Sequence, residues 1–83
     1  MSNDIAERIK QVTVAILRVD ESSIKDESRF VEDLGATSIQ SIELVAAYEE
    51  EFDIDMDQDE ALAVKSVGDA IEFIGKAVAE QHE

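Results

Sequence analysis

Apolar side chains recur three or four residues apart in the first quarter of the chain, a spacing that places them on one face of a helix. We expect this first helix to begin near Asp4, because Asp4 and Glu7 form an acidic capping pair at its start. Its predicted buried stripe consists of Ile5, Ile9, Val12, Ile16 and Val19.

The second predicted helix has the clearest start signal in the chain. Thr37 is a favourable N-cap residue, and Gln40, three positions later, completes a capping box. The apolar positions predicted to face the core are Ile39, Ile42, Val45, Ala46, Tyr48 and Phe52. The acidic residues that lie outside this stripe are Glu43, Glu49 and Glu50.

The C-terminal third predicts one further long helix and one short one. Ser66 is the expected N-cap of the long helix, with Asp69 at its third position. Its buried face is predicted to consist of Val67, Ala70, Ile71, Ile74 and Val78. Before it, the polar stretch that starts at Asp53 has room for a short helical turn around Gln58–Leu62.

Helical periodicity lapses between Asp20 and Ala36, a segment long for a loop. We expect three apolar residues to anchor it to the core: Ile24, Phe30 and Leu34. Proline is absent and the chain has three glycines, so no linker divides it. The pattern predicts a single domain over residues 1–83, with a core of about 4–78, that folds as an all-α bundle of three main helices and one short helix.

Charge narrows the possible partners. The 83 residues include 21 acids and 7 bases, a net charge of −14, and no Lys or Arg occurs from Phe30 to Val64. Nucleic acids and anionic lipids require positive charge, so we expect neither as a partner and expect basic protein surfaces instead. No apolar stretch reaches the roughly 20 residues that a membrane span needs, and the N-terminus has no signal-like region. We expect a soluble, cytoplasmic monomer.

The side chains offer little for catalysis. There is no cysteine, and the single histidine, His82, lies next to the last residue. The alternating acids Asp53, Asp55, Asp57 and Asp59 resemble a calcium loop. A calcium-binding loop of that type has glycine at its sixth position and glutamate at its twelfth, where this chain has Gln58 and Val64. We therefore expect no enzyme and no dedicated metal site, with at most weak binding of divalent cations.

Ser38 is the candidate for chemistry. It falls in the first turn of the second predicted helix, where backbone N–H groups lack partners within the helix and the dipole is positive. A phosphate ester on this hydroxyl would be stabilised there, and Gly35 allows the chain to turn tightly just before it. Taken by itself, the position also fits an ordinary serine at a helix start.

The residues around Ser38 carry a family resemblance. Phe30–Ile39 (FVEDLGATSI), then Ile42-Glu43-Leu44-Val45 and Tyr48-Glu49-Glu50-Glu51-Phe52, resemble the acyl carrier proteins, four-helix carriers of fatty acid and polyketide synthesis. The resemblance runs from about Ile5 to Ile74 without an obvious gap.

The resemblance implies a 4′-phosphopantetheine attached to Ser38, beside Gly35 and Thr37, that carries an acyl group as a thioester. It also implies an acyl pocket, with matching positions at Val45, Ala46, Tyr48, Met56, Ala61, Leu62 and Val64. Glu43, Glu49 and Glu50 match positions that meet basic patches on partners, which would be a phosphopantetheinyl transferase and the acyl-transferring or synthase enzymes of lipid synthesis.

Two positions depart from the family pattern. Thr37 stands where the residue before the serine is usually acidic, and Gln40 stands where aspartate is common. The loss of these two negative charges predicts a specialised carrier with partners of its own. Two alternatives remain at this point: an aminoacyl or peptidyl carrier of the non-ribosomal type, which uses the same arm, and an unmodified acidic helical adaptor.

Overall fold

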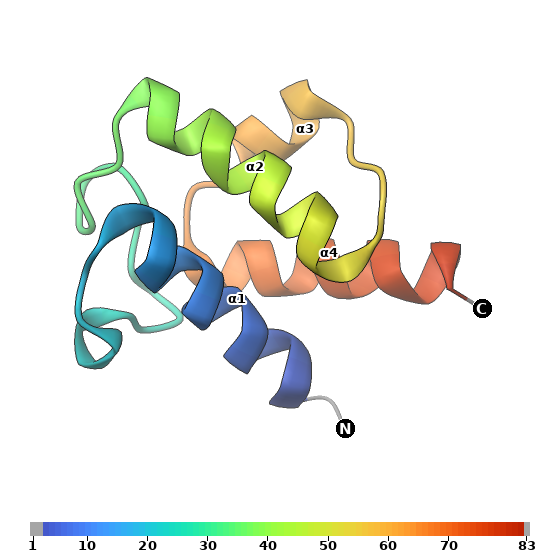
Figure 1. The fold of residues 1–83 in the computed structure, drawn as a ribbon, viewed down its shortest axis with the longest axis horizontal. Coiled ribbons are helices and arrows are strands. Elements are labelled where there is room, and N and C mark those ends of the chain that lie inside the picture. Colours follow the sequence, from blue (N-terminus) through green and yellow to red (C-terminus); the bar gives the residue numbers. More distant parts are fainter. Residues whose placement is uncertain (1–2, 83) are drawn as a thin grey trace.

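The computed structural model describes residues 3–82. Within that range the chain forms four α-helices and one 3-10 turn: α1 (Asn3–Leu17), η1 (Glu21–Ser23), α2 (Ser38–Phe52), α3 (Gln58–Ala63) and α4 (Val67–Gln81). α1 packs against α2 and α4, and α3 packs against α2 (Figure 1). Between residues 3 and 82 there is no strand, only an isolated bridge between Arg29 and Ser66. The predicted all-α bundle of three long helices and one short helix is confirmed.

α1 places a mixed row of side chains in the core. Ile9 and Thr13 are completely buried and Leu17 is nearly so. Thr13 and Leu17 were not in the predicted stripe, and Val19 lies beyond the end of the helix, where it is half-buried. The helix begins at Asn3, next to the predicted start; the side chain of Asp4, and with it the expected capping pair, lies outside the described residues.

The buried face of α2 differs from the prediction. Ile39 is 71% exposed and Ile42 is 47% exposed, and Ala46 also faces outward. The residues that α2 buries are Leu44, Val45, Tyr48 and Phe52. Because each residue turns the helix by about 100°, these four lie on one side and Ile39 lies almost opposite. The apolar residues of α2 therefore occupy two faces, of which only one meets the core.

The long segment between α1 and α2 is held by the start of α4. Ile24 and Phe30 are buried and Leu34 is half-buried, as the sequence predicts. Three backbone bonds join the segment to residues 65–68: Phe30 N–H to Lys65 C=O (3.0 Å), Val67 N–H to Ser28 C=O (2.9 Å) and Gly68 N–H to Asp26 C=O (2.7 Å); the first two form the bridge between Arg29 and Ser66. The segment is thus an ordered connection, packed on the bundle, that leads to the start of α2.

Close contact with this segment predicts a stability difference between two glycines of α4. A Cβ built on Gly68 would lie 3.0 Å from the carbonyl oxygen of Asp26, whereas one on Gly75 would meet only Ile5 Cδ1 at 3.9 Å. We expect the Gly68→Ala variant to be less stable than Gly75→Ala by about 1–3 kcal/mol, because the crowded atom belongs to the backbone. Urea unfolding of the two variants measures this difference, and equal midpoints would contradict the close packing.

α3 and α4 both begin at a capping side chain, of which the one at Ser66 was predicted. The Ser66 hydroxyl accepts the Asp69 N–H at 3.2 Å, which confirms the predicted cap of α4. Asp57 caps α3 in the same way through the Glu60 N–H at 3.1 Å. No helix in the described part of the chain is both long enough and apolar enough to cross a membrane.

Candidate functional site

Ser38 is the first residue of α2 and is exposed. The helix start around it is a complete capping box: the Gln40 N–H donates to Thr37 Oγ1 and the Thr37 N–H donates to Gln40 Oε1, each at 3.1 Å. These two bonds confirm the capping box that the sequence predicts. They fix the Thr37 backbone in an extended conformation (φ −81°, ψ 172°) and leave the Ser38 hydroxyl at the positive end of the helix, open to solvent.

Gly35 makes the tight turn that precedes this helix. Its φ of +76° lies in the left-handed region that favours glycine. The turn is closed by the Gly35 N–H to Val31 C=O (3.1 Å) and the Ala36 N–H to Phe30 C=O (2.8 Å). A Cβ added at Gly35 would meet nothing within 4 Å, so the space around this turn, three residues before Ser38, is open.

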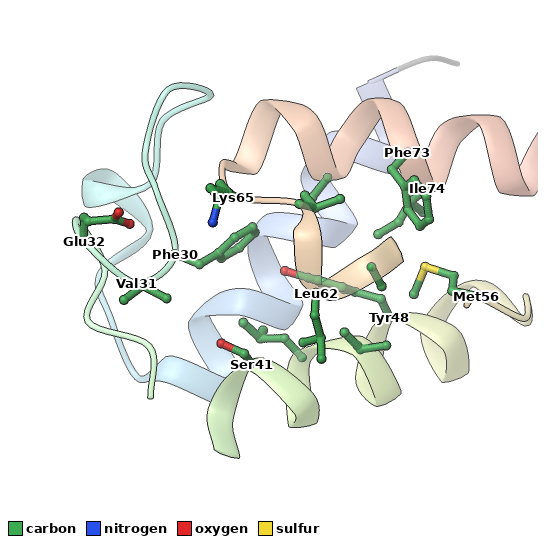
Figure 2. Close-up of a pocket in the computed structure, with 15 residues that line it drawn as sticks. Phe30, Val31, Glu32, Ser41, Tyr48, Met56, Leu62, Lys65, Phe73 and Ile74 are labelled. Carbon is green, nitrogen blue, oxygen red and sulfur yellow. The ribbon is translucent and has the colours of Figure 1, made fainter. Parts of the chain in front are cut away.

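A cavity of about 200 Å³ lies inside the bundle, next to the first turns of α2 (Figure 2). Ser41, which stands one helical turn after Ser38, or about 4.5 Å along the axis, is on its rim. Exposed Val31 and Leu62 mark its open side. The other lining residues are Phe30, Glu32, Leu44, Val45, Tyr48, Met56, Ala61, Val64, Lys65, Ala70, Phe73 and Ile74.

The structure brings together all but one of the residues expected at an acyl pocket. Val45, Tyr48, Met56, Ala61, Leu62 and Val64 line the cavity, but Ala46 does not. One residue after Val45, Ala46 is rotated away from the cavity and lies in a shallow groove with Ala15 and Ile16 of α1. The sequence reasoning also missed lining residues, among them Phe30 and Ile74, although both were predicted to be core residues.

Tyr48 crosses from α2 to α1 and, among the side chains that the structure describes, makes the one buried hydrogen bond between these two helices. Its hydroxyl lies 2.6 Å from Thr13 Oγ1. The Thr13 hydroxyl donates its only proton to the Ile9 carbonyl at 2.7 Å, so the Tyr48 hydroxyl is the donor to Thr13. Burial raises the pKa of Tyr48 to about 12. The phenol is therefore neutral at physiological pH.

The three glutamates expected to meet partners are not equivalent. Glu43 and Glu50 are exposed on the outward side of α2. Glu49 is half-buried, and its Oε2 accepts the Met56 N–H at 2.9 Å, so it holds the loop that carries one wall of the cavity. With the exposed apolar residues, the outward side of α2 forms a surface that we call the α2 face, composed of Ile39, Ile42, Glu43, Ala46 and Glu50.

Three of the four alternating acids after α2 help to form or fasten the turns in which they lie. Asp53 takes the left-handed conformation that ends α2 (φ 54°), and Asp57 caps α3. Asp55 forms a reciprocal pair of bonds with Gln81, each 2.8 Å, that fastens the loop to the end of α4. Among the residues that the structure describes, no group of three or more His, Cys, Asp or Glu side chains is arranged to hold a metal ion.

Comparison with known proteins agrees with this geometry. Residues 7–74 match the family described as "Phosphopantetheine attachment site". The acyl carrier protein of Sinorhizobium fredii (strain NBRC 101917 / NGR234) and the acyl carrier protein AcpP of Rhizobium meliloti (strain 1021) are each 44% identical to the chain over 77 residues, which is 93% of this chain and 99% of each relative.

These matches favour neither of the two alternatives, an aminoacyl carrier or an unmodified adaptor. The family implies a covalently attached 4′-phosphopantetheine, and its members are carriers, not enzymes. Because the match covers most of the chain and extends through both sides of Ser38, the chain belongs to the acyl carrier proteins.

Proposed function

We propose that Ser38 is the attachment site of the 4′-phosphopantetheine arm. The observation that carries this proposal is an exposed serine hydroxyl at the first residue of a capped helix, one turn from the rim of an apolar cavity. The residues fit the group: the helix dipole favours a phosphodiester at this position, and the open space at Gly35 gives a modifying enzyme access. When bound, the arm supplies the terminal thiol that forms a thioester with the acyl cargo, a group that this cysteine-free chain lacks.

The cavity is the proposed shelter for the acyl chain. Its walls are mostly aliphatic and aromatic side chains from α2, α3 and α4, which favour a hydrocarbon over water. Three of its lining residues are polar. Ser41 lies on α2, whereas Glu32 lies in the segment before α2 and Lys65 in the segment between α3 and α4. Phe30, Tyr48 and Ile74 are all at least 90% shielded from solvent and supply the deeper walls.

The α2 face is the proposed docking surface for partner enzymes. Glu43 and Glu50 supply negative charge, and Ile39 and Ile42 supply exposed apolar contact area beside Ser38. A partner with a basic patch fits this combination, which suits a phosphopantetheinyl transferase and the synthase or acyl-transferring enzymes of fatty acid, polyketide or related lipid synthesis. Glu49 contributes to this surface only indirectly, because its carboxylate is bonded to the loop at Met56.

Incubation with coenzyme A and a broad-specificity phosphopantetheinyl transferase tests the proposal. Intact mass should show the addition of one arm per chain. A chain that stays bare under conditions in which another carrier is fully modified would contradict the proposed function.

The neutral pair Thr37 and Gln40 predicts slower modification by a general transferase. An aspartate at position 37 keeps a side-chain oxygen for the Gln40 N–H, so Thr37→Asp should preserve the helix start and restore a negative charge beside Ser38. We expect this variant to be loaded several-fold faster than the wild type by a transferase of the general fatty-acid type. Initial loading rates followed by mass spectrometry measure the effect, and equal, fast loading of both proteins would remove the idea of a specialised partner set.

A further inference from the structure

The cavity stops short of α1. This helix packs against both α2 and α4, yet none of its residues lines the cavity. Tyr48 lines the cavity and its hydroxyl is hydrogen-bonded to Thr13 on α1, so its ring lies between the cavity and α1. In Figure 2 the Tyr48 side chain extends from α2 across the pocket. The position of this one ring therefore decides how far the cavity reaches toward α1.

The ring is held in place by its hydroxyl. Tyr48 is 5% exposed and Thr13 is fully buried, so their hydrogen bond is shielded from water. Thr13 keeps its own donor engaged with Ile9, which leaves Tyr48 as the group that would lose its partner if the ring moved. A hydrocarbon chain offers no acceptor in exchange, and a buried donor without an acceptor is strongly disfavoured. The neutral phenol cannot avoid this loss by ionising at physiological pH.

We propose that the hydrogen bond from Tyr48 to Thr13 limits the length of the acyl chain that the cavity shelters, and that the preferred cargo is a chain of medium length. This inference rests on the proposed function of the cavity. A chain methylene takes up about as much room as a water molecule, roughly 30 Å³, so a cavity of about 200 Å³ holds about six to eight carbons. Longer chains place their additional carbons outside the cavity, in water.

Acyl groups of increasing length test the limit. A broad-specificity phosphopantetheinyl transferase loads the wild-type protein from acyl-coenzyme A derivatives whose acyl chains have 4, 6, 8, 10, 12 and 16 carbons. Intact mass verifies each product. A sheltered chain stabilises the folded protein, so the melting temperature should rise on the order of 5 °C for each pair of sheltered carbons. We expect the rise to level off at about eight carbons. A melting temperature that keeps rising through twelve carbons would overturn the proposal.

Two variants separate the ring from its hydrogen bond. Tyr48→Leu shortens the wall, and Tyr48→Phe keeps the ring but removes the bond; in both, the plateau should move to ten carbons or more. Tyr48→Phe preserves the packed volume and so remains informative if Tyr48→Leu does not fold. An unchanged plateau in Tyr48→Phe would overturn the role of the hydrogen bond.

Phe52→Leu is the matched control. Phe52 is as buried as Tyr48 and lies one turn further along α2, but it does not line the cavity. We expect this variant to melt at a lower temperature for every cargo while the plateau stays at about eight carbons, and a shift like that of Tyr48→Leu would overturn the proposal. Failure of the proposed function has a different signature, because the mass of the protein would then not increase at all.

Discussion

Replacing Ser38 with alanine should abolish attachment of the arm. Incubated with coenzyme A and a phosphopantetheinyl transferase, the Ser38→Ala variant should keep its unmodified mass while the wild type gains one arm per chain. The physical reason is that the hydroxyl is the only proposed nucleophile, and it lies exposed where the helix dipole favours the resulting phosphodiester. The fold should persist, because Ser38 makes none of the capping bonds that start α2.

Ser41 provides a control on the same helix. Its hydroxyl donates to the Thr37 carbonyl at 3.0 Å and it is half-buried at the cavity rim. Ser41→Ala should therefore be loaded like the wild type. Continued loading of Ser38→Ala, or loss of loading in Ser41→Ala alone, would place the attachment site elsewhere.

Reversing the charge of the α2 face should slow modification substantially. In the double variant Glu43→Lys with Glu50→Lys, both carboxylates that face outward on α2 become ammonium groups. If a basic transferase docks there, the attraction becomes repulsion, and kcat/KM for loading should fall roughly tenfold or more at low salt. Added salt should narrow the difference between the variant and the wild type because it screens exposed charges.

The matched control changes net charge equally on another helix. Glu72 and Glu80 are exposed on α4, so Glu72→Lys with Glu80→Lys produces the same total charge away from the α2 face. This control should retain most of the wild-type kcat/KM. Equal losses in the two double variants would indicate a response to net charge and would argue against docking at the α2 face.

Local signals in the sequence were enough to predict the helix starts. The caps at Thr37 and Ser66 depend on residues three positions apart, so their geometry is encoded within one turn of chain. The same holds for the short helix, predicted at Gln58–Leu62 and observed at Gln58–Ala63. The positive φ of Gly35 also agrees with the predicted tight turn.

The direction in which α2 faces was harder to predict. Apolar residues occur around much of this helix, and periodicity alone assigned Ile39 and Ile42 to the core. The structure exposes them because Leu44, Tyr48 and Phe52 fill the space against the other helices. Which of two apolar faces is buried depends on tertiary packing. Exposed isoleucines beside the proposed attachment site fit the proposal that this surface binds partners.

Contacts between distant segments were also beyond the sequence. Thr13 was not identified as a core residue, because its burial depends on two hydrogen-bond partners. The Ile9 carbonyl accepts from its hydroxyl, and Tyr48, 35 residues away, donates to it. The bonds that join residues 26–30 to residues 65–68 have the same character. The cavity residues were predicted through the family resemblance, and that approach was wrong at Ala46, where helical rotation places the side chain outside.

Peptide mapping of the modified wild-type protein tests the central claim most directly. Trypsin cuts after Lys and Arg, so the chain yields one peptide from Phe30 to Lys65, in which Ser38 and Ser41 are the two serines. After loading from coenzyme A, fragmentation of this peptide should place one phosphopantetheine on Ser38 and none on Ser41. An unmodified peptide, or an arm located on any other residue, would contradict the proposal that Ser38 is where this protein holds its cargo.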